Sequence, residues 1–566
     1  MSSKGFLSGH GRQSREEKEF YELKIKAAEY FGANAISQKL EAALNEAFFE
    51  QPNDIHGYLA NYFSKLSSSP VISRIWGKEI YNGRGQLTVQ AEVYCIIKNE
   101  EKSICSAVIP SDCRALKDSS QESGEGIPNG AKQNQSVSTA LHWINQPLCK
   151  MLKGLDPTDQ TAVDKLLSDF FMERYLENLD VSNKEEEEEK ELREPEPEPS
   201  PPPAPSKDKK HKDKGKKRNS KEKPEPSLTP PDPPVSVVPG CMAVGAVSLA
   251  VAKTAALLMD TPLYKHISSL RGLQALSPLH MPIPMITLLS CGKASPGKLN
   301  LMDEVILVPG AGQRAKQVIA MCLELQEEVR RILSISSEKG PVLVGLSESG
   351  SIQGGYDHPE QPLDLITEAS NNLGLALGEE LCLAVNCAAH ELMDYPRGKY
   401  EVMNGTPKSP DELVDMYISL KSKYPGLMAL IDPFRKEDVE QWEKLSAAIG
   451  TSCCILADKA AEQPTCSSTE ARPNLPGVKG VILKHSDETT VTDLLNLIKE
   501  HTGGLSILSV SYGEACDDSL SDMAVGLGVT YLKLGGLSGG ERATKYNRLI
   551  CIEEELAQQG ILGTVI

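Results

Sequence analysis

The sequence of 566 residues predicts an α/β protein whose C-terminal half is a β/α barrel. Short apolar runs bounded by Gly or Pro recur there, and such runs are typical of strands covered on both faces. Runs ending at Asp432, Asp458 and Lys484 are spaced by 26 residues, about the length of one strand–helix unit, and another ends at Lys533. Because C-terminal strand ends form the active site of such a barrel, we expect Asp458, Lys484 and Lys533 in one mouth.

Composition and charge narrow the class of protein. A chain of this length can bury a large core and hold two or three domains. Its formal net charge of −18 disfavours nucleic acid as a partner. The 14 cysteines lack the C-x-x-C spacing of metal ligands, and the N-terminus lacks the apolar core of a signal peptide. We therefore expect a cytoplasmic protein with reduced cysteines.

One long apolar segment, residues 237–259, resembles a membrane span in length. It contains Pro239, Gly240 and Lys253 together with many alanines. This composition suits a helix packed tightly inside a protein better than a helix in lipid. We therefore expect no membrane span.

The N-terminal residues 14–66 form a predicted unit of their own. Apolar residues recur at helical spacing over residues 16–31, 35–49 and 55–66, which predicts three short amphipathic helices. Helices this short are marginal alone and need a partner surface. The segment 52–63 resembles short helical dimerisation and docking modules of flagellar and kinase-anchoring proteins. Packing of these helices on the chain's own domain is the alternative.

Residues 70–272 are predicted to form a small α+β domain with an interruption. The segment 79–93 contains a turn followed by alternating apolar residues, as in a β-hairpin. Residues 182–235 contain an acidic block, a Glu/Pro alternation and a basic block, with too few apolar residues to offset the entropy of the chain. We expect a disordered, solvated insertion there, and the barrel over residues 273–566.

Two C-terminal segments carry a resemblance to a known family. Residues 512–527 are similar to the Ser-Gly-Glu-Thr-Glu-Asp segment of the enolase family, and residues 532–556 resemble its C-terminal signature, including Ile552-Glu553-Glu554-Glu555-Leu556. The resemblance covers residues 75–180 and 236–566. It implies an enolase-type β/α barrel with an N-terminal α+β capping domain.

The resemblance implies a reaction and roles for several residues. The family is a carbon–oxygen lyase, phosphopyruvate hydratase, which converts the phosphorylated small molecule 2-phosphoglycerate to phosphoenolpyruvate and water in glycolysis. By motif, Lys484 becomes the catalytic base and Lys533 the cation that holds the substrate carboxylate. Asp303 aligns with a glutamate of the family that contacts the substrate. If the alignment is shifted by one residue, Glu304 takes this position instead. Glu348 is the candidate acid, provided that one residue is inserted before it.

The family's Mg²⁺ site is degenerate in this sequence. Magnesium prefers octahedral ligation by oxygen, largely from carboxylates and water. The three family carboxylates map to Asn386, Ile431 and Asp458, so only Asp458 is retained. Asn386 can offer a carbonyl oxygen, and Asp432 could substitute for its neighbour Ile431 only if the strand end is re-aimed. A further ligand, a loop serine, is absent from residues 111–114.

The phosphate-binding residues of the family have changed as well. The family's Ser-His-Arg-Ser segment corresponds to residues 509–512, which lack the histidine and the arginine. The family's loop histidine maps to Ala294, and the neighbouring Lys293 could compensate in part, as a point charge.

A competing motif, Leu-Ser-Gly-Gly-Glu at residues 537–541, is identical to the signature loop of ABC-type ATPases. No phosphate-binding G-x-x-x-x-G-K-[ST] sequence accompanies it. Ser538 and Glu541 have the spacing of a capping box, so we expect them to begin a helix.

Two hypotheses follow from these observations. The first is an enolase-like lyase of the divergent sperm-type branch, a homo-oligomer such as a dimer, in the cytoplasm and associated with the flagellum or cilium. The second is a catalytically weak or inactive structural protein that docks to a flagellar partner. The retained lysine pair favours the first hypothesis, and the missing magnesium carboxylates favour the second.

Overall fold

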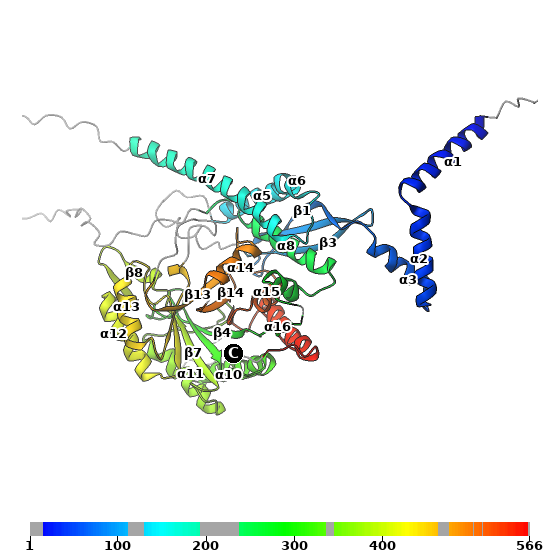
Figure 1. Cartoon of the computed structure of the whole chain (residues 1–566). Helices are drawn as coiled ribbons and strands as arrows, with labels where there is room; N and C mark the ends of the chain where they lie inside the picture. Colours follow the sequence, from blue (N-terminus) through cyan, green and yellow to red (C-terminus); the bar gives the residue numbers. More distant parts are fainter. Residues whose placement is uncertain are drawn as a thin grey trace, which may run out of the picture. The chain divides into compact units, whose positions relative to one another are not determined.

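The computed structural model describes residues 15–110, 129–192, 237–274, 276–335, 345–461, 475–501, 503–511 and 513–563. The chain divides into two compact units (Figure 1). The smaller unit comprises residues 1–70 with 96–100, and the larger comprises 71–95 with 101–566. The predicted loop at residues 111–114 lies outside the described residues.

The smaller unit contains the three predicted helices, α1 (Arg15–Ala33), α2 (Ile36–Glu50) and α3 (Ile55–Lys65). The backbone breaks at Ala35 and Gln51, both at positive φ, and Asp54 caps α3 by accepting a hydrogen bond from the N–H of Gly57. Most apolar side chains of these helices are exposed, and Phe49 is 81% exposed. The three predicted helices are thus present.

The larger unit begins with a three-stranded sheet in the order β1 (Val71–Tyr81), β2 (Leu87–Ile97), β3 (Glu100–Val108). The α-helices that follow are α5 (Asn129–Trp143), α6 (Cys149–Leu152), α7 (Gln160–Leu192), α8 (Met242–Leu258) and α9 (Leu263–Leu270). The hairpin predicted over residues 79–93 is present as β1 and β2. Together these elements make an α+β region.

Helix α7 corrects the predicted start of the insertion. It continues to Leu192, so residues 182–192 are helical rather than disordered. Glu and Lys are good helix formers, and the first proline of the tract is Pro195. The remaining part of the predicted insertion, residues 193–235, lies outside the described residues.

Helix α8 is the apolar segment that resembled a membrane span. Nearly all of its side chains are buried within the protein. Within the described ranges, no single helix is long and apolar enough to cross a membrane, and only α8 and α9 taken together, bent by 105°, pass on length and composition.

Eight strands close into the predicted barrel. Seven run parallel, and β5 is antiparallel to both of its neighbours. In spatial order the strands are β4 (Ile283–Ser290), β5 (Glu304–Pro309), β7 (Leu381–Asn386), β11 (Leu427–Ile431), β12 (Cys454–Ala457), β13 (Val478–Lys484), β14 (Leu505–Ser509) and β15 (Tyr531–Gly535). The α/β fold class is therefore confirmed.

Helices cover the barrel from outside (Figure 1). The helices are α10 (Ala315–Ile335), α11 (Glu360–Leu373), α12 (Pro410–Lys423), α13 (Val439–Ile449), α14 (Val491–Glu500), α15 (Ser519–Leu527) and α16 (Gly540–Gln558). The short strands are β6 (Ile352–Gln353), β8 (Met393–Asp394), β9 (Lys399–Met403) and β10 (Thr406–Lys408). Of these, β6 pairs with β4, and β8, β9 and β10 form a small separate sheet.

The barrel interior is filled by apolar side chains, one or two from each of β4, β5, β7, β11, β12, β13 and β14. Ile306, Ile431, Ile482 and Ile507 belong to one buried cluster. Burying one such side chain contributes about 1.5–3 kcal/mol. Ile431 therefore serves the core.

Candidate functional site

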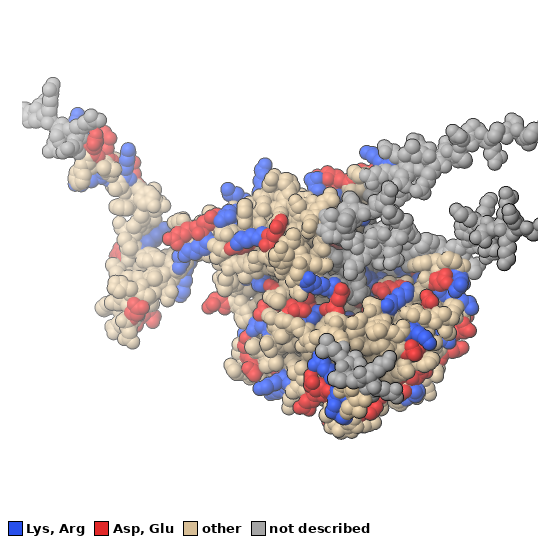
Figure 2. Space-filling model, turned by 180° about the vertical axis from the view of Figure 1, so that it is seen from behind, with Lys and Arg blue, Asp and Glu red and all other residues tan. Residues whose placement is uncertain are grey.

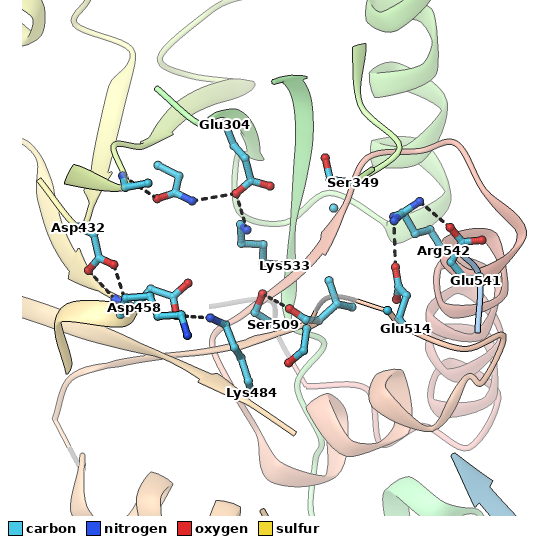
Figure 3. A pocket seen from close by; sticks show the side chains of 18 of the residues that line it. Glu304, Ser349, Asp432, Asp458, Lys484, Ser509, Glu514, Lys533, Glu541 and Arg542 are labelled. Carbon is cyan, nitrogen blue, oxygen red and sulfur yellow. Dashed lines mark hydrogen bonds and ion pairs between the residues drawn. The ribbon is translucent and has the colours of Figure 1, made fainter. Parts of the chain in front are cut away.

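The two lysines predicted at strand ends lie at the same level of the barrel rim. In the strand register Lys484 is opposite Ser509, and Ser509 is opposite Lys533. Both lysines line one cavity at the C-terminal ends of the parallel strands, together with Asp458 and Asn386 (Figure 3). The strand-end repeat thus brings Asp458, Lys484 and Lys533 together, as the periodicity predicted.

Lys484 forms an ion pair with Asp458, with 2.6 Å between Nζ and Oδ1. Both side chains are more than four-fifths buried. Burial opposes ionisation of Asp458, but the positive charges of Lys484, Lys533 and Lys459 hold the pKa of this carboxyl below its ordinary value. Asp458 is thus a counter-ion for the predicted base.

Lys533 forms a second ion pair, with 2.6 Å between its Nζ and Oε2 of Glu304. Glu304 also accepts hydrogen bonds from Thr287 Oγ1 and Asn386 Nδ2, each at 3.1 Å. Burial alone would raise the pKa of Glu304, yet Lys533 and these donors hold it below its ordinary value. Burial likewise disfavours the charged form of Lys533, but Glu304 and Asp458 raise the pKa of this lysine. The pair is therefore ionised.

The direction of β5 explains why Glu304 reaches the rim. Glu304 is the first residue of β5, and because this strand is antiparallel, its start lies beside the ends of β4 and β7. Asp303 does not line the cavity, and its carboxylate lies close to Gly292. The register alternative, Glu304, is thus the residue whose carboxylate faces Lys533.

Asp432 has a structural task at the same rim. It follows β11 at φ 45° and is 2% exposed. Its carboxylate accepts hydrogen bonds from the backbone N–H groups of Asp458 (2.8 Å), Lys459 (2.8 Å) and Ala460 (3.4 Å). Burial and the neighbouring charge of Asp458 raise the pKa of Asp432 to about 7. The strand end is thus bent so that Asp432 lines the cavity. Both of its carboxylate oxygens, however, bind the backbone of the turn after β12.

These contacts test whether the strand ends fit a magnesium ion. Asn386 donates to Glu304, and its Oδ1 accepts from the N–H of Ala388 at 3.3 Å. Asp458 is paired with Lys484, and Ile431 is in the core. Within the part of the chain that the structure describes, no group of three or more His, Cys, Asp or Glu is placed to hold a metal ion. The donor set does not fit Mg²⁺.

A buried cluster of charged residues lies at the wall of the same cavity, opposite the two lysines. Glu514 contacts Arg542 (Nε to Oε1, 3.2 Å) and Lys545 (Nζ to Oε2, 2.7 Å), and Arg542 also contacts Glu541 (2.7 Å). Glu514, Arg542 and Lys545 are each more than nine-tenths buried. Sequence reasoning did not single out this cluster, although its members lie in the two segments that carry the family resemblance. It fixes the start of α16 against the loop after β14.

The candidate acid, Glu348, lies in an adjoining hollow. It does not line the cavity of the two lysines. Its side chain is 62% exposed and pairs with Arg84 at 3.0 Å, and Arg84 lines both spaces.

Two other expectations need correction. Ser538 does not cap α16: the N-cap position is Gly539 at φ 114°, without a side-chain cap, and Glu541 binds Arg542 instead. A capping box is therefore absent at this helix, although the helix itself begins as expected. Lys293 does not reach the cavity of the two lysines, and its Nζ donates to the carbonyl of Glu391.

Comparisons with known proteins agree with this architecture. Residues 278–564 match the family described as "Enolase, C-terminal TIM barrel domain". The chain is 54% identical to Enolase 4 of Danio rerio over 564 residues, covering 100% of this chain and 96% of the relative. Enolase 4 of Homo sapiens is 43% identical over 576 residues, with 98% and 91% covered. Cytosolic enolase 3 of Arabidopsis thaliana is 25% identical over 544 residues, with 94% and 97% covered.

Proposed function

Because the chain belongs to the enolase family, we propose that it is a lyase that converts 2-phosphoglycerate to phosphoenolpyruvate and water. The observation that carries this proposal is the pair of lysines, Lys484 and Lys533, at one level of one cavity. Each lysine is held by a carboxylate at 2.6 Å. A site so arranged offers a base and a fixed positive charge to one small anion.

In the proposed reaction, the ammonium group of Lys484, which is paired with Asp458, first gives up a proton to solvent. The neutral amine then takes the proton from C2 of the substrate, next to the carboxylate. The electron pair of the broken C–H bond moves toward the carboxylate, where the ammonium group of Lys533 stabilises the developing negative charge. The bond between C3 and its hydroxyl then breaks, the hydroxyl takes up a proton and leaves as water, and a C2–C3 double bond forms. The proton taken from C2 returns Lys484 to the ammonium form that pairs with Asp458.

Three roles are assigned to carboxylates in this proposal. Asp458 orients Lys484, and Glu304, rather than Asp303, contacts the substrate beside Lys533. Glu348 would supply the proton to the leaving hydroxyl. For this its exposed side chain must leave Arg84 and turn into the cavity of the two lysines. No step is assigned to a magnesium ion, because the strand ends do not fit one.

The test is dehydration of 2-phosphoglycerate by the purified full chain, followed by the ultraviolet absorbance of the new double bond, with and without Mg²⁺. We expect Lys484→Ala to lower the rate at least about 100-fold, since a positioned general base contributes about 10²–10⁴-fold. Lys479→Ala is the matched control: Lys479 lies on the same strand, but its Nζ contacts the carbonyl of Gly450. Equal rates for the wild type and Lys484→Ala would refute the enzymatic function.

A second candidate function is a catalytically weak or inactive structural protein that docks to a flagellar partner. It is favoured by the unsuitable metal-donor set and by the exposed apolar side chains of α1–α3. In this proposal, as in the first, the protein is a cytoplasmic homo-oligomer associated with the flagellum. A chain lacking residues 1–70 should then lose partner assembly. Unchanged localisation of that truncated chain would argue against docking through this unit.

Nucleic acid is not proposed as a partner. Figure 2 shows Lys and Arg interspersed with Asp and Glu over the described surface of the face in view, without a continuous basic patch there. The net charge of −18 points in the same direction.

A further inference from the structure

We infer that the cavity at the barrel rim binds its phosphorylated hydroxy-acid substrate without a divalent cation, with Lys459 contributing positive charge from the turn after β12. This inference deepens the proposed function, since it concerns the same site. Three features of the rim support it: its carboxylates already have partners in the protein, two of its ammonium groups keep hydrogen-bond donors to spare, and it contains an unused hydroxyl.

The carboxylates of the cavity are committed to groups of the protein. Asp432 accepts three backbone N–H groups, and Asp458 is paired with Lys484. Glu304 has three partners, and Glu514 has two. A divalent cation would have to displace these partners to gain its ligands. Each of these carboxylates therefore already has at least one partner in the protein.

Two lysines of the cavity, Lys484 and Lys533, keep unused hydrogen-bond donors. An ammonium group carries three N–H donors, and each of the contacts of Lys484 to Asp458 and Lys533 to Glu304 uses one of them. Lys459 follows directly after Asp458, lines the same cavity and is half-buried. Positive side chains thus line the space from the turn after β12 and from the ends of β13 and β15. A ligand rich in acceptor oxygens, such as a phosphorylated carboxylate, matches this excess of donors.

A buried hydroxyl provides the third observation. Ser511 lines the cavity and is 5% exposed, and its Oγ has no hydrogen-bond partner among the described residues. An unpaired buried polar group costs free energy, which a bound ligand can remove. Since the hydroxyl both donates and accepts, it suits a phosphate oxygen. It also lies in the segment where the sequence lacks the family's phosphate-binding histidine and arginine.

The experiment is calorimetric titration of 2-phosphoglycerate into the full chain, once with a chelator and once with excess Mg²⁺. We expect dissociation constants that agree within about twofold between the two conditions. Lys459→Ala should weaken binding roughly tenfold in the chelator, because hydrogen bonds to charged groups are the stronger class. Lys444→Ala, on the outer helix α13, is the matched control and should bind like the wild type.

Binding that requires Mg²⁺, or no binding in either condition, would overturn the inference. Unchanged affinity of Lys459→Ala would remove that residue from it. These results are distinct from failure of the proposed function: binding in chelator without turnover leaves the inference standing and removes the enzyme. If the chain turns over substrate but binds it only with Mg²⁺, the enzymatic function stands and the inference is wrong.

Discussion

Two sides of the barrel rim use equivalent strand-end positions differently. The lysine side consists of the ends of β13 and β15 and the start of β5, where Lys484, Lys533 and Glu304 face the cavity. The aspartate side consists of the ends of β7, β11 and β12, where Asp432 binds three backbone N–H groups. A strand-end carboxylate can therefore serve the shape of a loop instead of a ligand. Counting carboxylates at strand ends overstates the capacity to bind a metal.

The largest expected effect comes from breaking the lysine side. Lys533→Ala leaves the carboxylate of Glu304 buried without its cation, and removing one partner of a buried pair costs about 3–5 kcal/mol. Urea unfolding measures this loss. Adding Glu304→Gln to the same chain should restore part of the stability, because the buried charge is then gone. A loss below about 1 kcal/mol for Lys533→Ala alone would mean that the pair is not buried as described.

Asp164 is a buried carboxylate whose partners are uncharged, in contrast to Glu304, which is paired with a lysine. Asp164 accepts hydrogen bonds from Gln160 (2.9 Å), Ser248 (2.7 Å) and Thr492 (2.9 Å from N–H and 2.7 Å from Oγ1), and so ties α7 to α8 and α14. Burial raises the pKa of Asp164 from 3.8 to about 6, although these hydrogen bonds oppose the rise. Glu304, which has a lysine, is moved in the opposite direction.

The raised pKa of Asp164 determines how the stability of the folded chain changes with pH. Above pH 6 the ionised Asp164 destabilises the folded chain, and the penalty disappears as pH falls from about 6 to about 4. We therefore expect wild type to gain about 3 kcal/mol relative to Asp164→Asn over that interval, since one pKa unit corresponds to about 1.4 kcal/mol. Unfolding free energies of both chains at a series of pH values measure the difference. A constant difference would show that Asp164 does not titrate there.

Breaking the aspartate side should have a smaller effect. Asp432→Ala removes the acceptor of three backbone N–H groups, and it places a residue less suited to positive φ there. We expect a loss of about 2 kcal/mol, because an unsatisfied buried donor costs about 1–3 kcal/mol. Asp432→Asn keeps an acceptor and tolerates this conformation, so it should lose less. Thermal unfolding compares the two variants, and equal losses would count against the anchoring role.

The smallest effect is expected at an exposed lysine. Lys444 contacts Asp411 and Glu440, each at 2.8 Å, with its side chain 44% exposed. Exposed ion pairs contribute little, because water and salt screen them. Lys444→Ala should therefore leave the unfolding midpoint unchanged within error. A marked fall would show that exposed pairs in this chain matter as much as those at the rim.

The strand-end pattern accounts for what the sequence could predict. Apolar runs at regular spacing predicted the barrel and the shared mouth of Lys484 and Lys533, because parallel strands place equivalent ends at one rim. The same rule could not choose between Asp303 and Glu304, since that choice depends on the direction of β5. An antiparallel strand among parallel ones puts its start, not its end, at the mouth.

Pairings between residues distant in sequence could not be predicted from the sequence. The triple acceptor role of Asp432 depends on how the turn after β12 curls back on it. The contacts of Glu514 with Arg542 and Lys545 join the loop after β14 to α16. Local spacing also misled at Ser538, because Gly539 at positive φ took the cap position. Such contacts follow from the tertiary fold.

The most direct test of the central claim, that Lys484 and Lys533 address one substrate from one rim, is a crystal structure of the full chain with 2-phosphoglycerate and a chelator. We expect the ligand carboxylate within about 2.7–3.2 Å of Lys533 Nζ, and C2 facing Lys484 Nζ. A ligand bound outside the cavity, or an empty cavity with both ion pairs unchanged, would contradict the claim.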